Sequence, residues 1–134
     1  MSQENVSVGN PVIRRWLWAF ENDTSAFEAV LHPEIEWFPI DENYGRLHGI
    51  KAALRNRNEW IDAWEEHRFD DVEELAAEGD GVLLAVHMVG RGKTSGAVVE
   101  LRFYAHVKLR DDKVVYIHDY ADRGEALAAV GLKE

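Results

Sequence analysis

The sequence contains no cysteine, and this absence removes several kinds of chemistry at once. A chain without thiols forms no disulfide, offers no thiolate to a metal ion and has no cysteine nucleophile. The absence fits a reducing compartment, so we expect a cytoplasmic location. No apolar run approaches the roughly 18 residues of a membrane span, and residues 1–9 lack the apolar stretch of a secretion signal. We therefore expect no membrane association.

Positive charge is also scarce. Fifteen basic residues stand against 25 acidic ones, which gives a formal net charge of -10. Proteins that bind nucleic acid neutralise phosphates with basic side chains, so we expect no nucleic-acid partner. The six histidines form no pair at helical i, i+4 spacing, and His106 with His118 lacks a carboxylate partner on its face of the predicted sheet. We therefore expect no metal site.

Long linkers, repeats and cofactor motifs are missing as well. The run from Gly90 to Lys93 has the glycines of a phosphate-binding loop, but no helix follows to present its N-terminus, so we expect no cofactor. The chain is rich in aromatic residues, with five Trp, five Phe and four Tyr among 134 residues. These side chains suffice to fill one core and also to line a cavity. We predict a loose tail over residues 1–9 and a single domain over residues 10–134.

Hydrophobic periodicity places helices mainly before strands. The i, i+3, i+4 spacing predicts helices over residues 10–22, 25–31, 49–66 and 122–131. Alternation predicts strands over residues 34–40, 68–77, 81–91, 97–110 and 113–121. Ser25 with Glu28 resembles a capping box, and Asp122 with Glu125 resembles another. Helices followed by a run of antiparallel strands indicate an α+β layer fold.

One carboxylate in the last predicted strand needs an explanation. Asp119 continues the apolar row that contains Val115, Ile117 and Ala121. A carboxylate on the core side of a sheet is costly unless it is paired, protonated or facing a cavity where a ligand binds. The third possibility makes Asp119 a candidate site residue.

The orientation of Asp119 depends on how the last two strands pair, because a shift of one residue turns every side chain to the other face. A two-residue turn at residues 111–112 mixes apolar with polar partners. A three-residue loop over residues 110–112 pairs Val107 with Val115 and Phe103 with Asp119. We adopt the three-residue loop, which turns Asp119 inward.

The opposite face of this hairpin carries a mixture of rings and charges. Such a surface is typical of protein interfaces, and we expect a homodimer through it, although a merely solvated face with exposed tyrosines explains the pattern equally well. The residues expected at this interface are Arg102, Tyr104, His106, Tyr116, His118 and Tyr120.

Residues 16–132 carry a recognisable pattern in the segments HPEIEWFPI, LHGIKAALRNRNEWIDAW and AHVKLRDDKVVYIHDYADRGEALAAVGL. This pattern resembles the SnoaL-like branch of the NTF2-like superfamily, which includes polyketide cyclases, ketosteroid isomerases and limonene epoxide hydrolases. The resemblance implies a strongly bent, mixed sheet that wraps around three N-terminal helices to form a cone, with a short C-terminal helix. It also implies a deep apolar pocket and, commonly, a dimer.

Only some of the catalytic residues of these enzymes have a counterpart in this chain. The positions of the isomerase base and of its protonated aspartate correspond here to Trp37 and Ala105, so that catalytic set is absent. The epoxide hydrolases share the last-strand aspartate, but their arginine and second aspartate fall on a row of apolar residues in this chain. In the cyclases a last-strand aspartate acts with a nearby histidine, and Asp119 again matches. His87 is the histidine more suited to face inward, because His106 has outward parity.

These arguments lead to a set of candidate residues and to three functional hypotheses. The candidate catalytic residues are Asp119 and His87, and the candidate substrate-binding residues are Trp16, Phe20, Trp37, Tyr44, Trp60, Trp64, Phe103 and Ile117. The first hypothesis is an enzyme that applies acid/base chemistry to a small apolar, carbonyl-bearing molecule. The second is a noncatalytic module that only binds a hydrophobic ligand. The third is a structural dimer whose pocket has closed on its own tryptophans.

Overall fold

A computed structural model describes residues 6–132, apart from the side chains of Glu42 and Glu78. Its helices are α1 (Pro11–Asn22), α2 (Thr24–Ala29), α3 (Ile50–Asp62) and α4 (Arg123–Ala129), with a 3₁₀ turn, η1 (Glu42–Tyr44). Its strands are β1 (Val6–Ser7), β2 (Leu31–Phe38), β3 (Leu47–His48), β4 (Trp64–Glu78), β5 (Gly81–Gly92), β6 (Val98–Arg110) and β7 (Lys113–Tyr120). This order confirms the expected α+β class.

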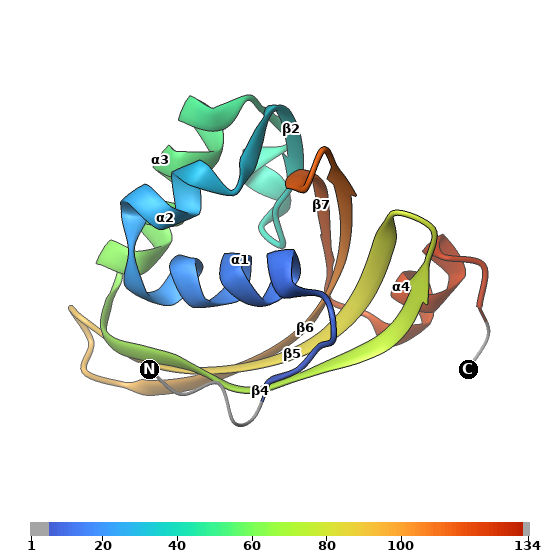
Figure 1. The fold of residues 1–134 in the computed structure, drawn as a ribbon. Helices are drawn as coiled ribbons and strands as arrows, with labels where there is room; N and C mark the ends of the chain where they lie inside the picture. Colours follow the sequence, from blue (N-terminus) through green and yellow to red (C-terminus); the bar gives the residue numbers. More distant parts are fainter. Residues whose placement is uncertain (1–5, 133–134) are drawn as a thin grey trace.

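All seven strands belong to one mixed sheet. The strand order is β1-β4-β5-β6-β7-β2-β3, with parallel pairing of β1 to β4 and of β2 to β7 and antiparallel pairing elsewhere. The sheet bends strongly around α1, α2 and α3, while α4 lies outside the bend (Figure 1). The expected cone around three N-terminal helices is therefore confirmed.

Bulges in β4 accompany this bend. The pairing of β4 with β5 changes register at three places, one of them between Phe69 and Asp71. A bulge leaves a residue unpaired and increases the local twist of its strand. At this bulge the backbone N–H of Phe69 donates to the carboxyl group of Glu21, at the end of α1. Burial raises the pKa of Glu21, against the effects of the Phe69 N–H and of Arg68. Helix α1 is thereby tied to the curved strand.

The hairpin of β6 and β7 corrects the predicted register. Its turn has two residues, Asp111 and Asp112, both with positive φ (55° and 60°), the conformation that matches the twist of the flanking strands. The register then shifts between Lys108 and Leu109, so that Ala105 rather than Phe103 pairs with Asp119. The predicted three-residue loop is wrong, and the true register differs from it by two residues. Because a shift of two preserves the facing of side chains, Asp119 still points inward.

The bulge also changes which valine enters the core. Val114 is fully buried and Val115 is only half-buried, whereas the predicted row contained Val115. The unpaired residue in β7 is Val115, at the register shift. A sequence pattern with two adjacent valines does not reveal which one precedes a bulge.

Part of the expected tail is instead a strand. Residues 1–5 lie outside the described part of the chain, but Val6 pairs with Val72 of β4, and both valines are buried. Arg14 of α1 donates to the carbonyl oxygens of Val6 and Val8. Residues 6–8 are thus held by hydrogen bonds and burial, and the prediction of a loose segment there is wrong.

Several element boundaries also differ from the predictions. Asp23, not Ser25, caps α2, with its Oδ1 accepting from the Ala26 N–H at 2.9 Å. Strand β2 starts at Leu31 and includes Pro33. Its pairing with β7 is irregular between Leu31 and Glu36, so the missing backbone N–H of the proline breaks no regular hydrogen-bond ladder. Helix α3 ends at Asp62. The predicted cap of α4 is confirmed, since Asp122 accepts from the Glu125 N–H at 2.9 Å.

Candidate functional site

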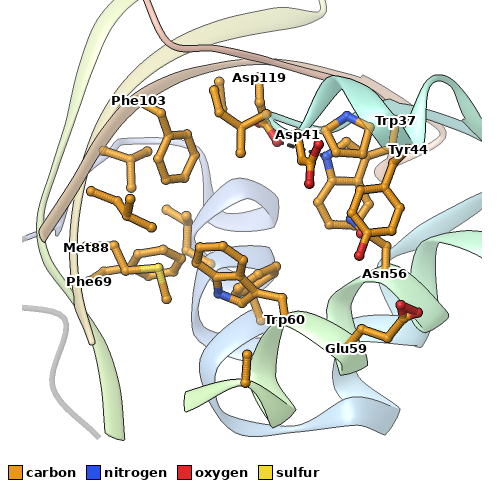
Figure 2. Close-up of a pocket in the computed structure, with 18 of the residues that line it drawn as sticks. Trp37, Asp41, Tyr44, Asn56, Glu59, Trp60, Phe69, Met88, Phe103 and Asp119 are labelled. Atoms are coloured by element: carbon orange, nitrogen blue, oxygen red, sulfur yellow. Dashed lines mark hydrogen bonds between the residues drawn. The ribbon is translucent and has the colours of Figure 1, made fainter. Parts of the chain in front are cut away.

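A cavity of about 290 Å³ lies between the helices and the concave face of the sheet. Its wall is contributed by α1, α3, the segment after β2 and the inward residues of β4, β5, β6 and β7. Figure 2 shows its side chains. Most of these side chains are apolar, and the rings in the wall are Trp16, Phe20, Trp37, Tyr44, Trp60, Phe69 and Phe103.

Asp119 is the carboxyl group set deepest in this apolar surface. Its Oδ2 accepts a hydrogen bond from Trp37 Nε1 at 3.0 Å, and a backbone hydrogen bond comes from Ile40. Strand β2 runs parallel to β7, with Trp37 paired to Ile117, and this pairing brings the indole to the carboxyl group across 82 residues of chain. The dashed line in Figure 2 marks this hydrogen bond.

The surroundings of Asp119 change its acidity. Burial raises the pKa of Asp119 from 3.8 to about 7, and the hydrogen bonds from Trp37 and Ile40 only partly oppose this effect. Desolvation disfavours the charged carboxylate, whereas donors that bond to the carboxylate favour it. A carboxyl group with a pKa near neutrality exchanges its proton readily under physiological conditions.

The remaining polar groups lie at the mouth of the cavity. Asp41 and Tyr44 come from the segment that connects β2 to β3, and Asn56 and Glu59 come from α3. Asp41 directly follows Ile40, the backbone partner of Asp119, and its Oδ1 accepts from the Asn43 N–H at 2.9 Å. In Figure 2, Asp41 and Tyr44 lie on the same side of the cavity as Trp37 and Asp119.

Most of the residues proposed from the sequence line the cavity. The structure brings together Asp119, Trp16, Phe20, Trp37, Tyr44, Trp60 and Phe103. Three proposed residues are elsewhere, namely His87, Trp64 and Ile117, and their placement corrects the prediction.

His87 is on the convex face of the sheet. Its Nδ1 lies 3.2 Å from Asp70 Oδ2 and its Nε2 lies 2.9 Å from Glu100 Oε1, so two carboxylates outside the cone hold the ring. Val86 and Met88, its neighbours along β5, line the cavity instead. Both faces of β5 are apolar in sequence, and the orientation of His87 could therefore not be read from alternation.

Trp64 and Ile117 belong to the packing around the cavity. The Trp64 ring lies over Gly90, where an added Cβ would come within 2.6 Å of it, and it contacts Trp60 edge to face with ring centroids 5.4 Å apart. The sequence predicted a helix over residues 49–66, with Trp64 on the same apolar face as Trp60. In the structure the helix ends earlier and Trp64 begins β4, so it does not share that face. Ile117 is fully buried in the core below Asp119.

Sequence reasoning missed several members of the wall. Phe69, Met88 and Leu101 line the cavity from β4, β5 and β6, and Asn56 and Glu59 line it from α3. Leu101 lies on the same alternating row as Phe103, so alternation along β6 was a signal that could have added it. Asn56 and Glu59 carried no such signal, because polar residues on an amphipathic helix normally face solvent.

The convex face shows the predicted concentration of rings, with one correction. His118 stacks on Tyr120 with ring centroids 4.2 Å apart and on Phe38 at 4.7 Å. Tyr104 and Tyr120, however, pack against the apolar cluster that α4 forms on this face. Part of the predicted dimer surface is thus covered by the chain itself.

Neither a metal cluster nor a membrane helix is found in the part of the chain that the structure describes. No group of three or more His, Asp or Glu side chains is arranged there to hold a metal ion. No helix within residues 6–132 has the length and the apolar character needed to cross a membrane.

Comparison with solved structures identifies the fold. A candidate polyketide cyclase from Xanthomonas campestris pv. campestris shares 19% sequence identity over 90% of this chain and 94% of its own, with a TM-score of 0.73. A protein with a ketosteroid isomerase-like fold from Catenulispora acidiphila DSM 44928, solved with trimethylamine, shares 13% identity over 93% of this chain and 95% of its own (TM-score 0.70). TerC, co-crystallised with polyporic acid, shares 20% identity over 83% of this chain and 88% of its own (TM-score 0.69).

Sequence comparison identifies the family. No curated protein matches the chain. The family model of the SnoaL-like domain matches residues 13–117, which is most of the chain but ends two residues before Asp119. Together with the cone-shaped sheet, this match shows that the chain belongs to the SnoaL-like domain family, within the NTF2-like fold.

Proposed function

We propose that this protein is a cofactor-independent cytoplasmic enzyme that binds a small apolar molecule and transfers a proton through Asp119. The observation that carries the proposal is a carboxyl group with a pKa of about 7 in the wall of a ring-lined cavity. The reaction is of the isomerase, cyclase or lyase type, in which a proton moves at a carbon next to a carbonyl group, or of the hydrolase type, in which the carboxylate takes a proton from an attacking water molecule and the acid returns it to the leaving group.

The chemistry of Asp119 suits such a step. The carboxylate removes a proton from the carbon, the electron pair of the C–H bond moves toward the carbonyl oxygen, and the resulting carboxylic acid returns the proton at another atom. The step needs no oxidant or reductant. Acid and base catalysis is most efficient when the pKa of the group lies near the working pH, and it contributes roughly 10²–10⁴-fold to a rate.

The cavity supports the proposal through its size and its surface. A volume of about 290 Å³ is close to the lower end of the range for ligand pockets. A molecule bound against these rings would exclude water from around Asp119, which strengthens its electrostatic interactions with that group. The relatives crystallised with polyporic acid and with trimethylamine support small-molecule binding as a use of this fold.

The test is an Asp119→Asn variant in which ligand affinity and turnover are measured separately. A co-purified ligand, sought by mass spectrometry, supplies the starting compound. We expect turnover to fall by about 10²-fold or more with affinity retained, because the amide fills the same space but transfers no proton. Asp112→Asn is the matched control, since it makes the same change on the exposed turn of the same hairpin. Unchanged turnover in Asp119→Asn would refute catalysis.

The alternative is a noncatalytic module that holds a hydrophobic ligand. It is favoured by the small number of polar groups around Asp119, whose hydrogen bonds come from an indole N–H and from the backbone of Ile40. A ligand that binds with the same affinity to the wild-type protein and to the Asp119→Asn variant, and is recovered chemically unchanged from both, supports this alternative.

We further propose a homodimer through the convex face of β6 and β7. The stacked rings of Phe38 and His118 and the half-buried Tyr116, which α4 does not cover, support it. Sedimentation at micromolar concentration should report twice the mass of the chain, and Tyr116→Glu should shift the protein to the monomer, because a carboxylate there must be desolvated at the interface. A monomeric wild-type protein would exclude the dimer.

A further inference from the structure

The cavity has an unusual balance of charge. The acidic side chains of its wall are Asp119 inside and Asp41 and Glu59 at the mouth. Within the described part of the chain, the basic residue in the wall is Arg102, which lies on β6 between Leu101 and Phe103. Because side chains alternate along a strand, the inward position of Phe103 turns the Arg102 side chain to the convex face. Among the described residues, the charged groups that a ligand meets are thus all carboxyl groups.

The same wall carries ring faces in place of cationic donors. Trp16, Trp37 and Trp60 line the cavity. Tyr44 lies beside Asp41 at its mouth (Figure 2). The face of an aromatic ring is negative and attracts a cation, with tryptophan the strongest of the rings. The Trp37 N–H is already bonded to Asp119. Trp16 Nε1 and Trp60 Nε1 are buried without a hydrogen-bond partner among the described residues, and these neutral donors suit an acceptor on the apolar body of a ligand.

The charge of the whole protein acts in the same direction. The chain has a formal net charge of -10, and a low-dielectric cleft lined by one sign of charge focuses that field. At the mouth, a bound anion would face carboxylates with no cationic partner in the described wall, and deeper in the cavity it would find only the neutral indole donors of Trp16 and Trp60. A positively charged nitrogen at the mouth would be attracted by both the carboxylates and the ring faces. The cavity therefore discriminates by charge as well as by shape.

We propose that the ligand of this cavity is an apolar molecule that carries a positively charged nitrogen, an alkylammonium group. The nitrogen lies near the mouth, between Asp41, Glu59 and the ring of Tyr44, and the apolar body lies against the inner rings. This inference rests on the proposed function, since it names the class of molecule that enters the site of Asp119.

Asp41 is the residue best placed to hold the ammonium group. Its carboxylate is held in a turn by the Asn43 N–H and it follows Ile40, whose backbone bonds to Asp119. The ammonium group is thereby placed at one end of the cavity, with Asp119 facing the apolar body next to it. Proton transfer would then occur on a carbon of the body rather than on the nitrogen.

Three probes of equal length separate charge from shape: 4-phenylbutylamine, 4-phenylbutan-1-ol and 4-phenylbutanoate, which are cationic, neutral and anionic at pH 7. Their binding is measured by calorimetry and by the fluorescence of the tryptophans in the wall. We expect the amine to bind about tenfold or more tightly than the alcohol, from the combined attraction of rings and carboxylates. We expect the acid to bind most weakly.

Variants then assign the preference to this site. Asp41→Asn and Glu59→Gln should each lower the affinity for the amine by about threefold to tenfold and leave the affinity for the alcohol unchanged. Glu28→Gln is the matched control, because it removes one charge from an exposed position on α2 outside the cavity wall. Equal losses in the control would assign the effect to net charge and would overturn the inference.

The outcomes distinguish this inference from the proposed function. If the alcohol binds as tightly as the amine, or the acid binds more tightly, the charge preference is refuted while the cavity remains a small-molecule site. If none of the three probes binds saturably at millimolar concentration, both the inference and the small-molecule site are refuted.

Discussion

Arg57 and Asp119 are ionisable side chains that lie in the interior of the described part of the chain, Arg57 buried and Asp119 partly buried at the cavity wall, and their surroundings differ. Arg57 on α3 is only 4% exposed, and its guanidinium donates to Phe20 O, Ala19 O and the Thr24 hydroxyl at 2.7 to 3.2 Å. It also donates to the neighbouring Asn58 amide at 2.9 Å. Burial lowers the pKa of Arg57, and Asp23 and Asp62 oppose that effect.

Asp119 has a much poorer set of partners. A carboxylate can accept about four hydrogen bonds, and Asp119 has the Trp37 indole and the Ile40 backbone. The rest of its surroundings is the cavity. The comparison teaches that a buried charge with most of its hydrogen bonds made holds elements together, since Arg57 connects α3 to the end of α1 and the start of α2. A buried carboxyl group with unused capacity beside a cavity is instead available to a ligand.

The largest expected effect is on the pH dependence of stability. Folded Asp119 keeps its proton up to about pH 7, whereas the unfolded chain releases it near 3.8. The folded state therefore binds more protons between these values, and its stability falls as the pH rises through this window. Asp119→Asn removes this dependence, which amounts to at most about 4 kcal/mol at about 1.4 kcal/mol per pKa unit.

Denaturant unfolding of both proteins at pH 4 and pH 8 measures this difference. Every other ionisable group is common to the two proteins, so the difference between their pH profiles reports on Asp119. Water that enters the cavity reduces the expected value. The same pH profile in wild type and variant would show that Asp119 is not desolvated.

The second effect tests the other side of the comparison. Arg57→Leu removes the guanidinium donor of the Phe20 carbonyl and leaves the Ala19 carbonyl with the Asp23 N–H as its donor. We expect the free energy of unfolding to fall by about 3 kcal/mol. Arg55→Leu is the matched control, because Arg55 is exposed on the same helix and should change stability by less than about 0.5 kcal/mol. Similar losses in the two variants would contradict a structural role specific to Arg57.

The smallest effect refines the account of Asp119. Trp37→Phe removes the indole donor that favours the carboxylate, so the pKa of Asp119 should rise further, by less than about one unit. Carbon-13 NMR of the labelled carboxyl group measures the shift directly. Trp18→Phe, a partly buried tryptophan of α1 outside the cavity wall, is the control. A pKa that falls in Trp37→Phe would mean that water replaces the indole.

Local patterns identified much of the fold because they depend on neighbours along the chain. The i, i+3, i+4 spacing of the helix predicted over residues 10–22 puts Ile13, Trp16, Leu17 and Phe20 on one buried face. The first three are buried, and Phe20 is partly buried and lines the cavity. Alternation along β6 and β7 predicted the inward orientation of Asp119, and the error of two residues in register left that orientation unchanged. His87 was misplaced because its strand is apolar on both faces, which removes the period on which the assignment depends.

The sequence by itself determined the α+β class, the family, and the presence of one carboxyl group on the apolar face of the last strand. Only the tertiary structure decided what surrounds that group, because parallel pairing of β2 with β7 brings Trp37 to Asp119 from a distant part of the chain. It also decided that Asp41 and Glu59 lie at the same opening. The periodicity of a sequence indicates on which face of a helix or strand a residue lies. A cavity forms between helices and strands, so its lining depends on how they pack.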